Sequence, residues 1–211
     1  MTKKLTNFYR EDIPKLLEEK KNLIGVELGV AQGNYAKKLI NYKNFDFFYG
    51  VDNFSFSTHD TNEYILALKE IGLKENYKIL RMNFKEALKV FPDNSIDFIY
   101  FDGFAHTGQN YGETIYEWYK KMKPNSIMSG DDYDPKWKLN MFIIDEFSKK
   151  NNFDLLITDT KENHKFSSWI IKITNKKELI KVDYPKYYKY LEILKSYKLY
   201  LNCLYKIFSK K

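Results

Sequence analysis

This chain of 211 residues has little cysteine and little arginine. Its single cysteine, Cys203, excludes an internal disulfide and fits a reducing compartment. Arginine occurs only twice, at positions 10 and 81, whereas a nucleic-acid-binding surface favours arginine in a basic stripe. We therefore predict that nucleic acid is not a partner.

Long apolar runs are also lacking. No stretch approaches the roughly 20 apolar residues that span a bilayer, and the N-terminus has no apolar segment typical of a secretion signal. The expected location is therefore cytoplasmic. The net charge of +7 is concentrated in residues 186–211, which hold seven lysines and one glutamate, so the rest of the chain is nearly neutral.

Apolar runs of strand length alternate with helix-like windows up to about residue 174, which predicts an α/β fold. We expect strands at residues 23–28, 47–52, 77–82, 96–102, 126–131, 153–158 and 167–174. The expected helices lie at residues 33–43, 61–71, 84–91, 110–122 and 135–150. Continuous apolar strands are typical of a parallel sheet that helices cover on both faces.

The most informative segment is the glycine-containing turn after the first expected strand. Gly29 and Gly33 lie four residues apart, where the missing side chain lets a ligand approach the backbone. The phosphate-binding spacing Gly-x-Gly-x-x-Gly is absent, and Glu27 would repel a pyrophosphate but attract an ammonium group. We therefore expect a cationic, phosphate-free nucleoside ligand, and a nicotinamide-dependent oxidoreductase is the less favoured alternative.

Polar side chains follow each of the first five expected strands, at the edge where parallel sheets bind ligands. They are Glu27, Asp52 with Asn53, Asn83, Asp102, and Asp131 with Asp132. Asp52 lies 25 residues beyond Glu27, close to the spacing at which a strand-end carboxylate binds ribose hydroxyls. A helix cap or a turn residue is the alternative for Asp52.

These residues resemble the class I S-adenosylmethionine-dependent methyltransferases, over about residues 20–174. The segment Val26–Gly33 is similar to the motif that holds the methionine end of the cofactor, Asp52 to the ribose acid, and Asn83 with Phe84 to the adenine site. The resemblance implies a Rossmann-like, doubly wound, seven-stranded sheet, mostly parallel with the last strand antiparallel. It implies S-adenosylmethionine contacts from Glu27, Leu28, Gly29, Gln32, Gly33, Asp52, Asn53, Asn83, Phe84 and Asp102.

Two further segments, residues 95–103 and 122–133, are similar to the subset that includes the catechol and macrocin O-methyltransferases. This resemblance implies methyl transfer to an oxygen of a small molecule or sugar, such as a surface-polysaccharide precursor. It also implies Mg²⁺ on Asp102, Asp131 and Asp132, whose hard oxygens suit that ion. The alternative is that Asp131 and Asp132 cap the next helix or orient a base.

The sequence departs from the catechol-type pattern at the position of its base. The lysine expected three residues after Asp102 is Ala105, and His106 follows it. An imidazole suits removal of a hydroxyl proton near neutral pH, so His106, with Asp102 and Asp131, is a catalytic candidate. A structural histidine is the alternative, and a non-catalytic cofactor-binding subunit is the alternative function that these intact residues argue against.

The outer segments complete the expected organisation: an N-terminal helical segment (1–20), the cofactor-binding domain (21–176) and a basic amphipathic helix (184–211). The last of these would pack on its own domain or on a second copy, or lie on an anionic membrane. The acceptor is expected against the loops at residues 53–61, 133–138 and 159–166. Their Lys136, Lys138, His164 and Lys165 would favour an anionic acceptor, unless they lie there by chance.

Overall fold

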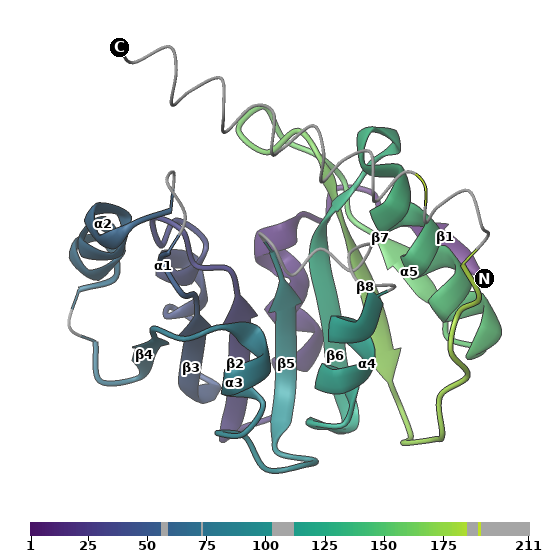
Figure 1. Cartoon of the computed structure of the whole chain (residues 1–211), viewed down its shortest axis with the longest axis horizontal. Coiled ribbons are helices and arrows are strands. Elements are labelled where there is room, and N and C mark those ends of the chain that lie inside the picture. Colours follow the sequence, from purple (N-terminus) through teal and green to yellow (C-terminus); the bar gives the residue numbers. More distant parts are fainter. Residues whose placement is uncertain (56–58, 73, 103–111, 185–189, 191–211) are drawn as a thin grey trace.

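The computed structural model describes residues 1–55, 59–72, 74–102, 112–184 and 190. These residues form an eight-stranded sheet in the order β1-β7-β8-β6-β5-β2-β3-β4, with helices on both faces (Figure 1). The expected seven strands correspond to β2 (Leu23–Leu28), β3 (Phe45–Val51), β4 (Tyr77–Leu80), β5 (Ile96–Phe101), β6 (Met122–Tyr133), β7 (Leu155–Ile157) and β8 (Ser167–Ile173). The predicted α/β fold is confirmed, and β8 is antiparallel to both of its neighbours.

The N-terminal segment differs from the expected purely helical one. β1 (Thr2–Lys4) pairs in parallel with β7 and adds an eighth strand at the sheet edge. Its three residues are all exposed, so it has no apolar alternation that a sequence pattern would reveal. The 3-10 helix η1 (Arg10–Leu17) follows and packs on the sheet through Ile13 and Leu17.

The helices are α1 (Ala36–Leu39), α2 (Thr61–Ile71), α3 (Phe84–Ala87), α4 (Glu113–Tyr119) and α5 (Lys138–Lys150), with the 3-10 turn η4 (Pro135–Trp137) before α5. α2 has the predicted bounds because both ends are specified locally. The Asp60 carboxylate accepts from the backbone N–H groups of Asn62 and Glu63, and Gly72 ends the helix with φ of 70°. α1 and α3 are shorter than expected.

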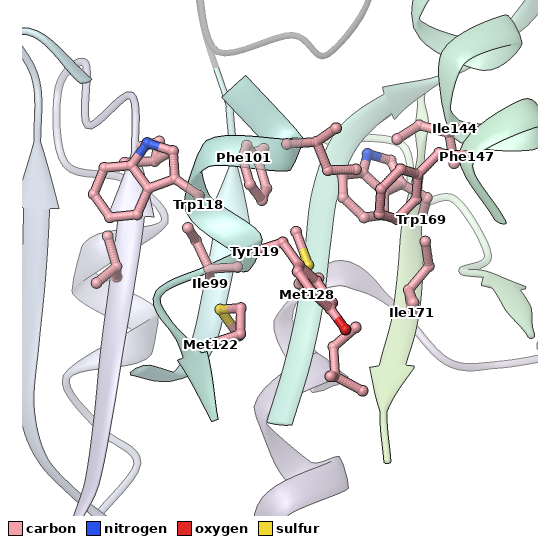
Figure 2. Packing of buried hydrophobic residues seen from close by; sticks show 14 of the residues in the cluster. Ile99, Phe101, Trp118, Tyr119, Met122, Met128, Ile144, Phe147, Trp169 and Ile171 are labelled. Carbon is pink, nitrogen blue, oxygen red and sulfur yellow. The ribbon is translucent and has the colours of Figure 1, made fainter. Parts of the chain in front are cut away.

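Two apolar cores lie on opposite faces of the sheet. Figure 2 shows one of them, in which β5, β6 and β8 contribute Ile99, Phe101, Met128, Trp169 and Ile171 against side chains of α4 and α5. The other lies under η1, α1 and α2. Because side chains alternate along a strand, Glu27 between Val26 and Leu28 points to the η1 face, as do Tyr100 and Asp131.

The described residues include no helix that is long and apolar enough to cross a membrane. The expected C-terminal helix at 184–211 lies outside the described residues, apart from positions 184 and 190.

Candidate active site

The turn between β2 and α1 has the geometry that its glycines suggest. Gly29 and Gly33 have φ of 92° and 83°, in the region that favours glycine, and the Gly33 N–H donates to the Val30 carbonyl over 2.9 Å. A Cβ added to Gly33 would lie 3.1 Å from the Ile71 side chain of α2. Gly33 therefore allows the turn to pack against α2, a structural reason that adds to the expected approach of a ligand.

Asp52, at the carboxyl end of β3, holds that turn in place. Its Oδ2 accepts from the backbone N–H groups of Val30 and Ala31 at 3.0 and 3.1 Å, and its Oδ1 accepts from the N–H of Phe54 at 3.1 Å. The β2 and β3 ends thus meet, as the sequence predicted for this edge. A carboxylate has about four lone-pair sites, and these three bonds leave one that can still accept from a ribose hydroxyl.

Glu27 is buried beside this turn with 1% of its surface exposed. The Tyr77 hydroxyl donates to its Oε2 over 2.8 Å. Burial raises the pKa of Glu27 to about 8, since the nearby Asp102 and Asp52 add to the effect and the Tyr77 hydrogen bond and Arg10 only partly offset it. A buried carboxyl of this kind gains its charge when a cationic group approaches.

The other expected cofactor residues have local structural roles. Asn83 caps α3, because its Oδ1 accepts from the Glu86 N–H over 2.8 Å while the Glu86 side chain accepts from the N–H of Asn83. Asn53 accepts from the N–H of Ser55 in a turn. Phe84 is half-buried, Gln32 is exposed, and Leu28 is fully buried so that only its backbone faces the edge.

A cluster that sequence reasoning missed lies at the ends of β5 and β6. Arg10, the first residue of η1, donates from Nη1 to Asp131 Oδ2 over 2.9 Å and lies 3.2 Å from His164 Nδ1. His164, in the turn between β7 and β8, places Nε2 2.9 Å from Asp131 Oδ1. Asp102 Oδ2 lies 4.0 Å from the same guanidinium nitrogen.

The charges of this cluster support one another. Burial of the Arg10 guanidinium opposes its charge, but Tyr100, Asp131 and Asp102 together outweigh that effect and raise its pKa above the ordinary value. Burial alone would raise the pKa of Asp131. The His164 hydrogen bond and the Arg10 charge outweigh burial, so the pKa lies below its ordinary value. Arg10 and Asp131 therefore form a buried ion pair.

The expected Mg²⁺ site does not fit this donor set. Both carboxylate oxygens of Asp131 are engaged, one by Arg10 and one by His164. In the part of the chain that the structure describes, no group of three or more His, Cys, Asp or Glu side chains is arranged to hold a metal ion. We therefore assign no chemical step to a metal.

The alternatives for Asp131 and Asp132 can be compared with the structure. Neither acid caps α5: Asp134 caps the preceding turn η4, where its carboxylate accepts from the N–H of Lys136, and the N-cap of α5 is Trp137. The carbonyls of Asp131 and Asp132 accept from the Asn140 side chain of α5, at 3.0 and 2.8 Å. The Asp131 carboxylate orients a histidine, but that histidine is His164. The candidate base His106 lies outside the described residues.

A separate cavity of about 420 Å³ lies at the opposite edge of the sheet, before β5 and β6 begin. Tyr116, Tyr119, Lys120, Lys176, Lys177 and Lys181 contribute to its lining. Among the described residues, none of the site residues expected from the sequence lines it, so it is distinct from the candidate active site.

Comparison with protein families gives one match, a methyltransferase domain, over residues 26–133. That range is slightly more than half of the 211 residues and includes the β2 turn, Asp52, Asn83, Asp102 and both acids of β6. None of the curated proteins compared with the chain matches its sequence.

Solved structures share the fold at low sequence identity. The O-methyltransferase TomG of Streptomyces achromogenes, involved in tomaymycin synthesis and bound to S-adenosylmethionine, is 11% identical with a TM-score of 0.61, over 78% of this chain and 79% of that chain. An O-methyltransferase of Bacillus cereus in complex with S-adenosylhomocysteine is 11% identical with a TM-score of 0.58, over 77% and 79% of the two chains. Spermidine synthase of Thermotoga maritima is also similar, at 14% identity and a TM-score of 0.59, over 84% of this chain and 68% of that chain.

Proposed function

Since this chain belongs to the methyltransferase-domain family that its residues 26–133 match, we propose that it transfers the methyl group of S-adenosylmethionine to an oxygen atom. The acceptor we propose is a hydroxyl of a small molecule or sugar, surface-polysaccharide precursors included. The observation that carries the proposal is the edge formed by Glu27, the Gly29–Gly33 turn and Asp52. The O-methyltransferases of like fold, solved with S-adenosylmethionine or its product, support this choice of donor.

Each group at this edge suits one part of the donor. S-adenosylmethionine supplies a methyl group on a positively charged sulfur, and its methionine end carries an ammonium group. Glu27, buried and close to neutral in its preferred state, provides a negative charge when the ammonium group approaches. Asp52 already fixes the turn and has one oxygen lone pair left for a ribose hydroxyl.

The reaction is a displacement in which an acceptor oxygen forms a bond to the methyl carbon while the carbon–sulfur bond breaks. The electron pair of that bond stays on sulfur, which becomes a neutral thioether, and the acceptor hydroxyl gives its proton to a base, the role that we propose for His106. Because the methyl group is already activated, most of the catalysis comes from aligning the two reactants. Asp102 and the Arg10–Asp131–His164 cluster adjoin the Glu27 side of the edge and supply polar groups for the acceptor.

The proposal also covers location and the C-terminal segment. We infer a cytoplasmic protein from the single cysteine. We also propose that the basic residues 184–211 contact an anionic membrane surface or a second copy of the chain. Deleting residues 184–211 and measuring vesicle binding and oligomeric mass tests this part, and unchanged values in both assays would reject it.

The central test is calorimetric titration of the full chain with S-adenosylhomocysteine and with NAD⁺. We expect binding of the first alone, and Asp52→Asn should weaken it by about tenfold or more because an ionised acceptor of hydrogen bonds is lost. Asp46→Asn, on an exposed position of β3, is the matched control and should leave the affinity unchanged. No binding of S-adenosylhomocysteine, or tighter binding of NAD⁺, would reject the proposed function.

The acceptor can be sought by incubating the protein and S-adenosylmethionine with hydroxyl-bearing metabolites and sugars. Mass spectrometry should detect the gain of one CH₂ group on an oxygen of one of them. A product methylated on nitrogen instead would retain the methyltransferase assignment and overturn the oxygen specificity.

A further inference from the structure

We propose that Arg10 is the resident cation of the acceptor side of this site, and that the protein therefore transfers methyl groups without a divalent metal. This inference rests on the proposed methyl transfer, but the binding experiment below is independent of turnover. It concerns three groups that come from distant parts of the chain: Arg10 of η1, Asp131 of β6 and His164 of the β7–β8 turn.

The hydrogen-bond geometry accounts for both protons of one guanidinium nitrogen. Arg10 Nη1 directs one N–H to Asp131 Oδ2 at 2.9 Å and the other to His164 Nδ1 at 3.2 Å. Nδ1 then accepts, so the proton of a neutral imidazole lies on Nε2 and is donated to Asp131 Oδ1 at 2.9 Å. This tautomer is assigned from the partners. The three side chains thus form a closed ring of hydrogen bonds around Asp131.

The guanidinium is held in its position from other sides too. It lies 4.4 Å from the centroid of the Tyr35 ring and 5.6 Å from that of Tyr100, and the Tyr35 hydroxyl donates to the Arg10 carbonyl over 3.1 Å. Only 14% of the Arg10 side-chain surface is exposed. Arg10 is therefore part of the wall of the site and not a surface side chain that reaches it occasionally.

The η1 helix and the β7–β8 turn are joined by a second ion pair. Lys161 Nζ, in that turn, lies 2.7 Å from Glu11 Oε1 of η1. This contact positions the two segments that carry Arg10 and His164 next to each other. The arrangement around Asp131 is therefore supported by its surroundings and does not depend on one contact alone.

A divalent ion at Asp131 would compete for the carboxylate oxygens with Arg10, His164 and Ser168, whose hydroxyl lies 3.4 Å from Oδ1. It would also stand close to a buried positive charge, which repels it strongly where water is excluded. Moving Arg10 away would leave its guanidinium without its carboxylate partner, which is unfavourable for a buried ion. Arg10 thus supplies one fixed positive charge beside Asp102 and Asp131, where the family resemblance implied a metal.

In this proposal Arg10 is a positioning residue. It fixes the orientation of the Asp131 carboxylate and, through it, of His164, and it keeps positive charge beside the carboxylate of Asp102, 4.0 Å away. No proton is transferred by Arg10 itself, because a guanidinium does not lose its proton in the working pH range.

The test measures binding of Mn²⁺ alone. Electron paramagnetic resonance detects that binding as a loss of the free-ion signal. The wild-type chain should not bind Mn²⁺ through Asp131, so Asp131→Asn should leave the Mn²⁺ binding of the wild-type chain unchanged. Arg10→Ala should gain a site with affinity at least about tenfold higher than wild type, because a repelling charge has gone from beside the carboxylates of Asp102 and Asp131. Adding Asp131→Asn to Arg10→Ala should abolish that gain.

Arg10→Gln serves as a second variant if Arg10→Ala does not fold, since it keeps a hydrogen-bond donor but no charge. Arg81→Ala, which removes the other arginine of the chain, is the matched control and should not change Mn²⁺ binding. Circular dichroism checks folding and titration with S-adenosylhomocysteine checks the donor site in each variant. Failure of that titration in the wild type would reject the proposed function without deciding the Mn²⁺ result.

Two results would overturn the inference. One is a wild-type chain that binds Mn²⁺ through Asp131, and the other is a folded Arg10 variant with no gain in Mn²⁺ affinity. Once an acceptor is found, EDTA should leave the wild-type rate of methyl transfer unchanged. A rate that EDTA abolishes and Mg²⁺ restores would also overturn the inference.

Discussion

Replacing Glu27 by glutamine should change how the stability of the protein depends on pH. The pKa of Glu27 is about 8 in the folded chain, compared with an ordinary value of 4.5. Between these two values the unfolded chain is ionised at this residue while the folded chain is protonated, so folding takes up a proton and stability falls as pH rises. At about 1.4 kcal/mol per pKa unit, the fall amounts to about 5 kcal/mol by the time the pH passes 8.

Glu27→Gln removes this titration and keeps an acceptor for the Tyr77 hydroxyl. We therefore expect the variant to be the more stable of the two at high pH, by several kcal/mol, and the difference to shrink toward pH 4.5. Urea unfolding followed by tryptophan fluorescence, repeated at several pH values, measures this difference. Glu75→Gln, at an exposed position, is the control. If the stability curves of Glu27→Gln and wild type run parallel with pH, burial does not raise the pKa of Glu27 and the reasoning is refuted.

The same substitution should oppose donor binding. An ammonium group beside Glu27 favours its charged form, so binding of S-adenosylhomocysteine by wild type should release a proton near neutral pH. Calorimetry in buffers of different ionisation enthalpy measures that proton. Glu27→Gln should abolish the release and weaken binding, and a release that persists in the variant would show that another group titrates.

The remaining predictions concern single positions. Gly33→Ala should destabilise the fold by about 1–3 kcal/mol, because φ is 83° and the added Cβ would lie 3.1 Å from Ile71; an unchanged urea midpoint would contradict this. Asn83→Ala should cost about 1 kcal/mol through loss of the α3 cap, and the same unfolding assay tests it. Asp131 has a lowered pKa, so its stabilising effect should be present above its unfolded pKa and be lost as pH falls through the folded value. Asp131→Asn should therefore flatten the acid limb of the stability curve, and an unaltered limb would rule out the ion pair with Arg10.

The sheet was predictable because each strand carries its own apolar signal. β5 reads as a continuous buried run, and α2 has a cap and a terminating glycine that are visible in the sequence. β1 has no such signal, because backbone hydrogen bonds to β7 hold it and its side chains are exposed. Local patterns therefore identify elements that bury side chains and miss those held by the backbone alone.

The candidate site was predictable only in part. The acids at the strand ends follow from the rule that parallel strands present their carboxyl ends at one edge. The positively charged partner of these acids could not be predicted from the sequence. Arg10 and Asp131 are 121 residues apart, and the same acids suit a metal ion or a guanidinium equally. The rarity of arginine in this lysine-rich chain was the one available signal for Arg10.

The short first strand has a consequence for how the molecule is held together and handled. β1 covers the outer edge of β7, where unpaired backbone groups would otherwise invite association with another chain. Arg10 is the sixth residue after β1, so β1 also anchors the segment that carries the guanidinium to the edge strand of the sheet. Removing the first ten residues would thus expose the edge of β7 to association and leave Asp131 without its arginine partner.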